Sequence, residues 1–576
     1  MHTQVEGVNV TNAPHHPGAA AGAGSPLDAD VLVVGAGPAG LGLANLLGRQ
    51  GVRVIVLEQL PELIDFPRGV GLDDESLRSL QAMGLVEKVL PHTTPQHVMR
   101  LVNGRGRVIA EIKPGTKEFG WSRRNAFVQP LVDKVLAEGL DRFDHVDLRL
   151  AHTVERIADH GDHVELEVST PQGPATMRAA YLVGADGGKS RTRKHIGVTF
   201  EGQSPSTRWL VIDVADDPLG TPNVFLGADP RRPYVSLGLP HAIRRFEFML
   251  FDGEPDSLVD DPTFVEGLLK DHVPHPSSLN FIRQRVYTHH SRIAGSFRRG
   301  RIFLAGDAAH LMPVWQGQGY NSGMRDSTNL AWKLAAVLRG DCDAALLDTY
   351  DAERRDHAKA MIDISVAFGR VIKPTNRFVA GLRDAAATVL NAAPPVKRHV
   401  AEMRYKPMPR YHRGAVVDAS TLEPGRSAAA LTGASHPVAS ANVKVSPVGT
   451  QFIQPRVDTA DRTDVLLDDL IGTTWAVVCW GINPAQIFSP DDLVALKALG
   501  ASLISLRPTT QLGNEVPTDG TIVAADRTGE IKRWFDDRPT PVVFLRPDRF
   551  VAAAGLTQDA PALLDALLTA ISFRSR

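Results

Sequence analysis

Three glycines and a glutamate near the start of the chain have the residue types and spacing of a dinucleotide-binding loop. Gly35, Gly37 and Gly40 stand between an apolar run, 31–34, and a stretch with helical character. The first glycine allows a tight turn, the second lets backbone N–H groups approach a pyrophosphate, and the third lets helix and strand pack closely. Glu58 ends the next apolar run, where its carboxylate would accept hydrogen bonds from a ribose. The pattern alone does not distinguish FAD from NAD, and a glycine turn without a ligand is the alternative interpretation.

A second segment has the chemistry to hold the other half of an extended dinucleotide. An apolar run ends in Gly306 and Asp307, and Gly317, Gly319 and Asn321 follow at the start of a predicted helix. Asp307 can accept hydrogen bonds from ribityl hydroxyls, and the two later glycines let the backbone approach an isoalloxazine edge. The helix N-terminus would stabilise the negative charge of a reduced flavin. The two segments together favour FAD, bound noncovalently.

Buried strands and helices must hold these loops in place. Short apolar runs are typical of parallel strands covered on both faces, and they occur at 31–34, 52–57, 181–186 and 301–305. Helical stretches are predicted at 73–89, 128–140, 321–339 and from 346 to beyond 368. Residues 146–169 alternate like antiparallel strands, and 208–285 alternates like the sheet of a second domain. Further on, strands are predicted at 475–480, 502–506 and 541–545, and a terminal helix at 560–571.

Several polar side chains near these motifs allow both a structural and a chemical interpretation. His310 follows the Gly-Asp pair, and a structural hydrogen bond competes with a role in proton transfer. His289 and His290 are adjacent, so on a strand they point apart and a shared metal is not expected. Asp73 and Asp74 are expected to cap the helix that begins there.

Composition limits the classes of partner. The 576 residues suggest two or three domains, and a net charge of −2 gives no electrostatic case for nucleic acid. Cys342 and Cys479 form no CxxC pair, so no metal site is expected and a reducing cytoplasm fits. No apolar run approaches the roughly 20 residues of a membrane span. The first 28 residues are interpreted as a disordered tail.

A third motif carries a resemblance to a known family. The segment 181–193 contains Asp186 and Gly187, followed by Ser190 and Arg193. With the two glycine segments, it resembles the Asp-Gly motif of the group A flavoprotein aromatic hydroxylases, where the motif is implicated in FAD and nicotinamide binding. The resemblance implies those roles for these four residues. Thr192 replaces the family's usual valine.

Longer motifs resemble one branch of that family, the 3-(3-hydroxyphenyl)propionate hydroxylases, which also act on 3-hydroxycinnamate. They lie at 66–75, 120–130, 232–236 and 313–326. The resemblance implies that Arg68 lines the flavin, Gln129 its ADP half, and Pro313 the oxygen-reaction site. Trp315 and Tyr320 are candidates for the substrate pocket, with core packing as the alternative for each.

The resemblance implies an α/β fold in three parts. A Rossmann-like FAD-binding domain of the glutathione-reductase type is expected at 29–200 and 286–375. An inserted β-sheet substrate domain is expected at 201–285 with parts of 95–125. Residues 376–411 would connect it to a thioredoxin-like C-terminal domain, 412–576, that has no CxxC pair and serves structural or dimer-forming packing.

The implied activity is that of a single-component monooxygenase. Reduced nicotinamide, by resemblance NADH, and O₂ would serve a flavin that hydroxylates a phenolic acid ortho to its hydroxyl group. A cytoplasmic enzyme and a possible homodimer are expected, and no catalytic side chain is assigned because the flavin does the difficult chemistry. The alternatives are a related flavin hydroxylase for a different phenol, a flavin oxidase, or a non-catalytic binder on the same fold.

Overall fold

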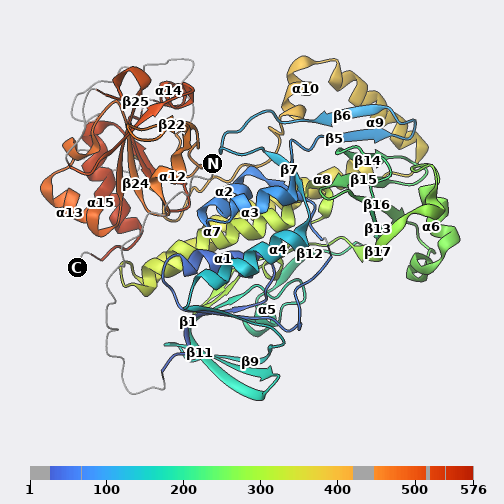
Figure 1. Ribbon diagram of the computed structural model, residues 1–576, viewed down its shortest axis with the longest axis horizontal. Helices are drawn as coiled ribbons and strands as arrows, with labels where there is room; N and C mark the ends of the chain where they lie inside the picture. Colours follow the sequence, from blue (N-terminus) through green and yellow to red (C-terminus); the bar gives the residue numbers. More distant parts are fainter. Residues whose placement is uncertain are drawn as a thin grey trace, which may run out of the picture.

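The computed structural model describes residues 26–66, 68–205, 207–419, 446–513, 519–538 and 540–574. The chain has the predicted α/β character, with several mixed sheets. In Figure 1, helices α1 and α7 form a central body, with one sheet-rich region on either side of it. The predicted disordered tail, 1–28, lies almost entirely outside the described residues.

The first sheet carries the dinucleotide loop. Its strands run in the order β19-β20-β11-β1-β2-β8, and the β9–β10 hairpin extends β11. The pairs of β1 with β2 and β11, and of β11 with β20, are parallel, as the buried apolar runs predicted. The strands are β1 Ala29–Val34, β2 Val54–Leu57, β8 Val146–Arg149, β9 Thr153–Asp159, β10 Val164–Thr170, β11 Gly173–Gly184, β19 Arg298–Arg299 and β20 Ile302–Leu304.

One strand prediction in this sheet was partly wrong. The pattern of residues 146–169 is like that of antiparallel strands, and β9 and β10 do pair in antiparallel fashion. Strand β8, however, lies parallel to β2, with Val146 opposite Val54. A strand at a half-covered sheet edge shows the same alternation of polar and apolar residues whether it pairs in parallel or antiparallel fashion. The pattern therefore could not predict the direction of β8.

Helices cover this sheet and bury its apolar residues. Helix α1 (Pro38–Gly48) packs along α7 (Gln318–Leu338), and both contribute to the core around β1 and β11. The predicted helical stretches are confirmed, with boundaries shifted by a few residues. The remaining helices of this part are α2 Asp74–Ala82, α3 Val86–Val89, α4 Gln129–Glu138, α5 Arg191–His195 and α8 Thr349–Ile372.

A second large sheet stands beside the first body. Its strand order is β17-β13-β16-β15-β14-β5-β6, so two strands from early in the chain complete a sheet made mainly of later ones. The strands are β5 Met99–Asn103, β6 Val108–Ile112, β13 Arg208–Ala215, β14 Val224–Ala228, β15 Tyr234–Leu239, β16 Ile243–Leu250 and β17 Asn280–Thr288, with helix α6 Pro262–Leu269 alongside.

Two small sheets lie between the larger bodies. One has the order β3-β7-β4 and the other the order β12-β18-β21. Their strands are β3 Gly71–Asp73, β4 Thr93–Pro95, β7 Arg124–Phe127, β12 Phe200–Gln203, β18 Ser291–Ala294 and β21 His310–Leu311. Each of these two sheets thus joins segments that are far apart in sequence.

The segment 376–411 is more regular than its prolines suggested. It contains α9 (Arg377–Asn391), capped by Asn376, and α10 (Pro394–Ala401), which begins with prolines in its first turn. Proline is well tolerated at that position because its missing N–H has no intrahelical acceptor there. Both helices pack on β6, so the segment covers the second sheet before the chain continues to the C-terminal region.

The C-terminal region has its own sheet, in the order β23-β22-β26-β25-β24-β27-β28. Cys479 is buried in its interior strand β24. The strands are β22 Arg456–Asp458, β23 Val465–Leu466, β24 Ala476–Trp480, β25 Ser502–Pro508, β26 Ile522–Asp526, β27 Val542–Leu545 and β28 Val551–Gly555. The helices are α12 Leu467–Ile471, α13 Pro490–Ala498, α14 Glu530–Asp536 and α15 Ala560–Ala570.

Candidate cofactor and substrate site

A cavity of about 550 Å³ lies between the first body and the second sheet. Gly37 from the first loop and Asp307 from the second both line it, so the two loops that the sequence singled out open into one space. Elsewhere its wall is formed by apolar residues of the second sheet, including Val224, Leu226 and Leu237. The site therefore joins a dinucleotide loop to an apolar compartment.

The glycine loop leaves room for a ligand where the sequence predicted one. A side chain at Gly40 would collide with the Gly35 carbonyl, since its Cβ would lie 2.0 Å from that oxygen. At Gly37, which caps α1, a Cβ would meet nothing within 4 Å. Glu58 accepts hydrogen bonds from the Ala36 and Leu60 N–H groups at 2.9 and 3.1 Å, which holds its carboxylate beside the loop. The space in front of Gly37 and the α1 N-terminus suits a pyrophosphate.

The Asp-Gly motif is held by its own side chains. The Asp186 carboxylate accepts from the Ser190 hydroxyl at 2.5 Å and from the Thr192 N–H at 3.0 Å. Ser190 in turn caps α5 by accepting from the Arg193 N–H. Of these motif residues, Gly187 lines the cavity, whereas Asp186 is occupied in shaping the loop.

Arg193 ties the Asp-Gly motif to the second cofactor loop. Its Nη1 donates to the Ala308 carbonyl at 2.8 Å and its Nη2 to the Gly188 carbonyl at 2.7 Å. The guanidinium also lies over the Phe200 ring, 3.7 Å from its centre. Arg193 therefore positions the backbone on both sides of the cavity.

Asp307 presents a carboxylate to the cavity. It follows β20 in a tight turn that begins at Gly306, whose φ is +60°. Its side chain is surrounded by protein but accessible from the cavity. Burial raises the pKa of Asp307 above its usual value, although the charges of His310 and Arg68 oppose the rise. Within the described residues no group donates a hydrogen bond to this carboxylate, so it is available to ligand hydroxyls.

His310 has a structural partner. Its Nε2 lies 2.7 Å from an Asp326 carboxylate oxygen, and both side chains are fully buried. The same oxygen accepts from the Gly306 N–H at 2.9 Å, while Arg354 binds the other at 2.8 Å. Burial alone would raise the pKa of Asp326, but the charges of His310 and Arg354 bring it below its usual value. This network fixes the turn that carries Asp307, which supports the structural interpretation of His310.

The start of α7 brings backbone groups to the cavity edge. Gly317 adopts the left-handed conformation that begins the helix, with φ of +61°, and a Cβ at Gly319 would meet nothing within 4 Å. Both glycines line the cavity. Asn321 does not line it: its side chain donates to the Gly71 and Gly317 carbonyls and so anchors the turn.

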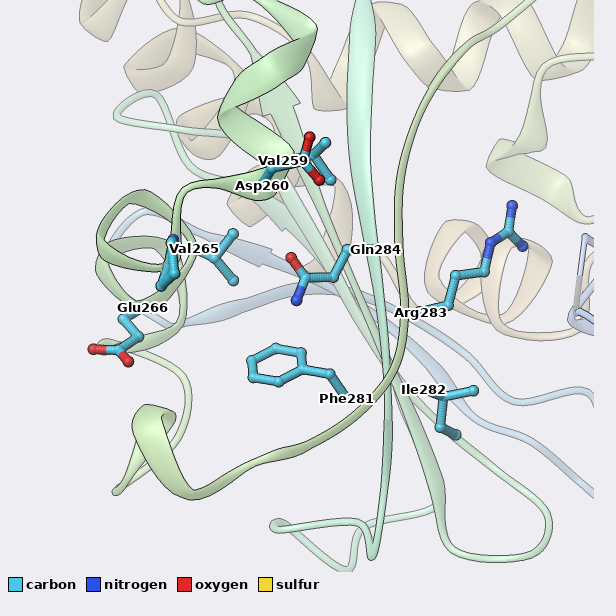
Figure 2. A pocket seen from close by; sticks show the side chains of 9 residues that line it. Val259, Asp260, Val265, Glu266, Phe281, Ile282, Arg283 and Gln284 are labelled. Atoms are coloured by element: carbon cyan, nitrogen blue, oxygen red, sulfur yellow. The ribbon is translucent and has the colours of Figure 1, made fainter.

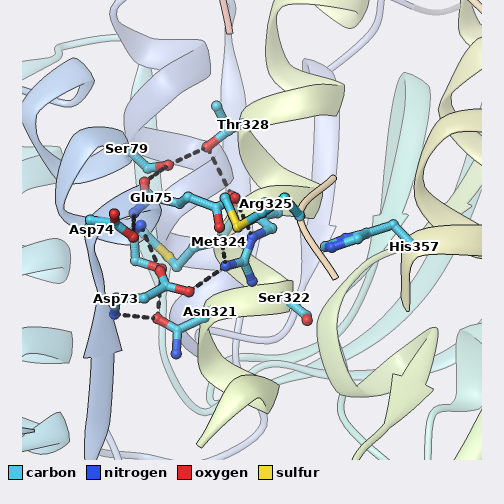
Figure 3. Close-up of polar contacts among 12 residues, drawn as sticks. Asp73, Asp74, Glu75, Ser79, Asn321, Ser322, Met324, Arg325, Thr328 and His357 are labelled. Carbon is cyan, nitrogen blue, oxygen red and sulfur yellow. Dashed lines mark hydrogen bonds and ion pairs between the residues drawn. The ribbon is translucent and has the colours of Figure 1, made fainter. Parts of the chain in front are cut away.

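A buried charge cluster locks α2 against α7 (Figure 3). Asp73 caps α2 by accepting from the Ser76 N–H at 3.0 Å, which confirms the predicted cap for Asp73, whereas Asp74 is the first residue of the helix. Arg325 bonds with Asp73 and binds Glu75 at 2.8 Å, and Lys406 lies 2.9 Å from Asp73. Burial would raise the pKa of Glu75, yet the charges of Arg325 and Lys406 hold it well below its usual value. The cluster keeps the two helices in register near the cofactor loops.

Arg68 and Gln129 meet at the cavity wall. The Gln129 side-chain oxygen accepts from the Arg68 N–H at 3.2 Å and from the Gly69 N–H at 2.6 Å, while its Nε2 donates to Asp133 at 2.9 Å. Both predicted residues line the cavity. Gln129 thus holds the Arg68 loop in place.

Of the remaining pocket candidates, Trp315 and Tyr320 line the cavity and Pro313 does not. Trp315 packs edge-on against Trp209, with ring centres 4.9 Å apart, and Tyr320 packs against Phe127 at 4.8 Å. Both aromatic residues therefore line the cavity and also pack against neighbouring aromatic rings. Pro313 is buried and precedes the turn that carries Trp315.

Polar residues of the second sheet that sequence reasoning missed reach the same cavity. Arg245 binds Asp213 through two hydrogen bonds of 2.7 and 2.9 Å, and Tyr287 donates to Glu247 at 2.7 Å. Arg245 and Glu247 share one face of β16, so two charges at alternate positions of a predicted strand were the available signal. Burial, then the charge of Glu247 and the hydrogen bond to it, raises the pKa of Tyr287 well above its usual value.

His289 also lines the cavity and was assigned no role there from sequence. It stacks on Trp209, with ring centres 5.6 Å apart and planes 10° apart. Burial lowers the pKa of His289 to about 3, so the ring is neutral near pH 7.

A second, shallower pocket of about 490 Å³ lies on the far side of β17, between that strand and α6. Figure 2 shows Arg283 pointing away from Val265 and Glu266, which line this pocket. The Arg283 side chain instead lies over the Phe66 ring at the main cavity, 3.7 Å from its centre. None of the cofactor loops reaches the second pocket.

None of the helices in the described part of the chain combines the length and the apolar character that a membrane crossing needs.

Solved structures with a similar fold include monooxygenases. The flavin-dependent monooxygenase PieE, solved with FAD and substrate, superposes with a TM-score of 0.76 at 20% identity, covering 95% of this chain and all of that one. The p-nitrophenol 4-monooxygenase of Pseudomonas putida gives 0.61 at 28% identity, covering 66% and 98% of the two chains.

Sequence relatives are closer. The chain matches the FAD binding domain family over residues 28–365 and the HcaD C-terminal domain over 449–570. A 3-(3-hydroxyphenyl)propionate/3-hydroxycinnamic acid hydroxylase of Mycolicibacterium smegmatis is 54% identical, covering 96% of this chain and 94% of the relative. The enzyme of the same name from Klebsiella pneumoniae is 48% identical, covering 94% of each. The chain therefore belongs to the family of FAD-dependent aromatic hydroxylases, as a flavin monooxygenase of the branch that contains these two enzymes.

Proposed function

We propose that this enzyme hydroxylates 3-(3-hydroxyphenyl)propionate, and also 3-hydroxycinnamate, ortho to the phenol, giving the 2,3-dihydroxy catechol in aromatic-compound degradation. FAD is the cofactor, and NADH and O₂ are the co-substrates. The main support for this proposal is one cavity that joins Gly37 and Asp307 to an apolar compartment of the second sheet. The chain is also 54% identical to a hydroxylase named for these substrates.

Most of the cofactor roles follow from residues on the wall of that cavity, and Glu58 lies beside its glycine loop. Gly37 and the α1 N-terminus would bind the pyrophosphate, Glu58 the ribose, and Asp307 the ribityl hydroxyls. Gly317 and Gly319 bring the α7 N-terminus to the ring edge, where its dipole favours negative charge. Bound FAD supplies the hydride acceptance and oxygen chemistry.

The other named residues act through these. Gln129 holds the Arg68 loop at the flavin, and Asp186, Ser190 and Arg193 shape the Gly187 turn. Gly35 and Gly40 permit the close packing behind the pyrophosphate, and Gly306 and Asn321 set the second loop and the start of α7.

The second sheet supplies the substrate compartment. Its apolar residues surround an aromatic ring and keep water from the reacting atoms. The Tyr287 hydroxyl donates its hydrogen bond to Glu247, so its oxygen is left to accept a hydrogen bond from the phenol. Such a bond increases phenolate character and favours attack from the ortho carbon.

The domain assignment is part of the proposal. Residues 29–200 and 286–375 form the FAD-binding domain, and 201–285 with β5 and β6 form the substrate domain. Residues 412–576 form a thioredoxin-like domain: β24 and β25 are parallel, whereas β27 and β28 run antiparallel beside them. Burial raises the pKa of Cys479 to about 12, which suits packing and not thiol exchange.

For assembly we propose a homodimer. Helix α9 exposes apolar side chains, with Phe378 and Val389 74% and 71% exposed, which a second copy would cover. Light scattering of the purified enzyme should give twice the chain mass, and F378S should shift it toward the monomer.

Product identification tests the substrate assignment. The holoenzyme should oxidise NADH faster when 3-(3-hydroxyphenyl)propionate is added, and mass spectrometry should find the catechol with one oxygen atom from ¹⁸O₂. A panel of meta-substituted phenols with NADH and NADPH ranks the alternatives. Peroxide without catechol would indicate an oxidase, and absence of flavin absorbance after reconstitution would indicate a non-catalytic binder.

A further inference from the structure

Arg124 lies deep in the cavity and faces the apolar compartment. It begins β7, and Ala126 and Val128, at alternate positions of the same chain segment, pack in the apolar cluster that contains Val224 and Leu226. Residues at alternate positions of a strand share one face, so the Arg124 side chain leaves β7 on the side of that cluster. It is one of the residues that line the cavity.

The guanidinium of Arg124 is only partly satisfied by the chain. Its Nε donates to the His97 carbonyl at 3.0 Å. Neither of its two terminal nitrogens has a hydrogen bond or a carboxylate partner among the described residues, and the side chain keeps accessible surface although protein surrounds it. Burial lowers the pKa of Arg124 to about 10, so the group is still a cation at neutral pH.

The other arginines of the cavity are differently placed. Arg245 is neutralised by its two hydrogen bonds to Asp213. Arg68, Arg283 and Arg285 surround the Phe66 ring, at 5.6, 3.7 and 5.7 Å from its centre. Among these cavity arginines, Arg124 alone both has an uncompensated charge and faces the apolar compartment of the second sheet.

An uncompensated cation in such a place is unfavourable until an anion meets it. We propose that Arg124 binds the side-chain carboxylate of the phenolic acid through its two terminal nitrogens, and so selects acids over neutral phenols of the same shape. The two parallel N–H groups suit a carboxylate, and a charge-assisted pair holds the ring at a fixed distance from the anchor. This inference rests on the proposed function and names the specificity residue of that site.

The test compares a substrate with its neutral analogue. Catechol formation and flavin absorbance titrations are measured with 3-(3-hydroxyphenyl)propionate and 3-(3-hydroxyphenyl)propanamide for the wild type, R124Q, R124K and the control R100Q. Arg100 is a half-buried arginine of β5 that is paired with Glu111 and does not line the cavity. We expect R124Q to raise Kd and KM for the acid roughly 10- to 100-fold and those for the amide less than about 3-fold. R124K should be intermediate and R100Q unchanged.

The outcomes separate the two proposals. Equal losses for acid and amide in R124Q would make Arg124 a structural residue and overturn the inference. So would a wild type that binds the amide as tightly as the acid, a result that needs no variant to fold. If the wild type makes no catechol from the acid although it binds the acid better than the amide, the proposed reaction fails while the anchor stands.

Discussion

The Asp307 carboxylate is available to a ligand because no described residue donates a hydrogen bond to it. Its neighbours Gly306, His310 and Asp326 are bound to one another, and the Asp307 carboxylate is left facing the cavity. A hydrogen bond from a ligand hydroxyl to a carboxylate contributes about 1.5–3 kcal/mol.

The D307A enzyme should therefore bind FAD roughly 10- to 100-fold more weakly. Its apo form should unfold at about the wild-type temperature, because no described group loses a hydrogen bond. Fluorescence titration of apoenzyme with FAD and thermal unfolding without FAD check the two parts. An unchanged FAD affinity would remove Asp307 from the cofactor site.

Asp133 is a second residue whose environment predicts a measurable effect. Burial raises the pKa of Asp133 to about 7, although the hydrogen bond from Gln129, the nearby Tyr320 hydroxyl and the charge of Arg68 oppose the rise. Because its pKa in the folded state lies above the unfolded value near 3.9, the fold retains the proton longer than the unfolded chain. Stability from this group is therefore lost as pH rises from about 4 to about 7.

D133N removes the ionisation while keeping a side-chain oxygen for Gln129. We expect it to raise the thermal midpoint at pH 8, with up to about 4 kcal/mol of folding free energy at stake, and to have little effect near pH 4. D141N, at an exposed aspartate of the following turn, is the matched control. A stabilisation that is the same at both pH values would contradict the ionisation argument.

At the scale of elements, local patterns were sufficient where one segment determines its own structure. The apolar runs around 31–34 and 301–305 predicted buried parallel strands, and the spacing of Gly35, Gly37 and Gly40 predicted the loop between β1 and α1. The same reasoning predicted that the Asp307 carboxylate lies just after the end of β20.

Features that depend on two distant segments were not predictable in this way. Strand β8 lies parallel to β2 because of its position at the sheet edge, and β5 and β6 join strands more than a hundred residues later. Arg124 reaches the cavity only because β7 contacts strand β15 of that second sheet, and the Arg193 contact with Ala308 needs both loops in place. Pairing partners of this kind leave no trace in the sequence around one residue.

Two glycines of the same element should respond differently to the same substitution. G37A places a methyl group in space that no described atom occupies, so the apo fold should keep its thermal midpoint. The methyl group should instead displace the pyrophosphate and weaken FAD binding about 10-fold or more, equivalent to one lost phosphate hydrogen bond.

G40A should disturb the fold itself, because its Cβ would lie 2.0 Å from the Gly35 carbonyl. A loss of about 1–3 kcal/mol in stability is expected along with weaker FAD binding. Thermal unfolding of both apo variants separates them, and G37A behaving like G40A would show that the open space belongs to the fold and not to the cofactor.

At the scale of the whole molecule, the C-terminal region is joined to the cofactor-binding body by buried charges. Arg546 of the C-terminal region binds Glu353 of α8 at 2.8 and 2.9 Å, and Lys333 of α7 lies 2.7 Å from the same carboxylate. A second link runs from Arg78 of α2 to Asp468 of α12 at 2.7 Å. In Figure 1 the C-terminal region lies beside one end of α7, the helix whose other end carries Gly317 and Gly319.

The link at Glu353 should dominate acid stability. Burial alone would raise the pKa of Glu353, but the charges of Arg546 and Lys333 lower it to about 2. A folded-state pKa below the unfolded value near 4.3 means that this stability is present above about pH 4.3 and is lost as pH falls toward 2. R546M leaves Glu353 and Asp548 without their main cation, so we expect a loss of about 3–5 kcal/mol at pH 7. R527M, at a half-exposed pair with Asp458, should cost less than about 1 kcal/mol.

Thermal unfolding and limited proteolysis of the holoenzyme at pH 7 and pH 4 check this prediction. If the buried pair joins the two regions, R546M should release the C-terminal region to protease at temperatures where the wild type and R527M resist. Its stability should also depend less on pH between 4.3 and 3, because the carboxylate that drives the wild-type dependence has lost its partner. Equal stability of R546M and R527M would mean that apolar contacts such as the one between Trp332 and Trp475, 5.4 Å apart, hold the regions together without the charges.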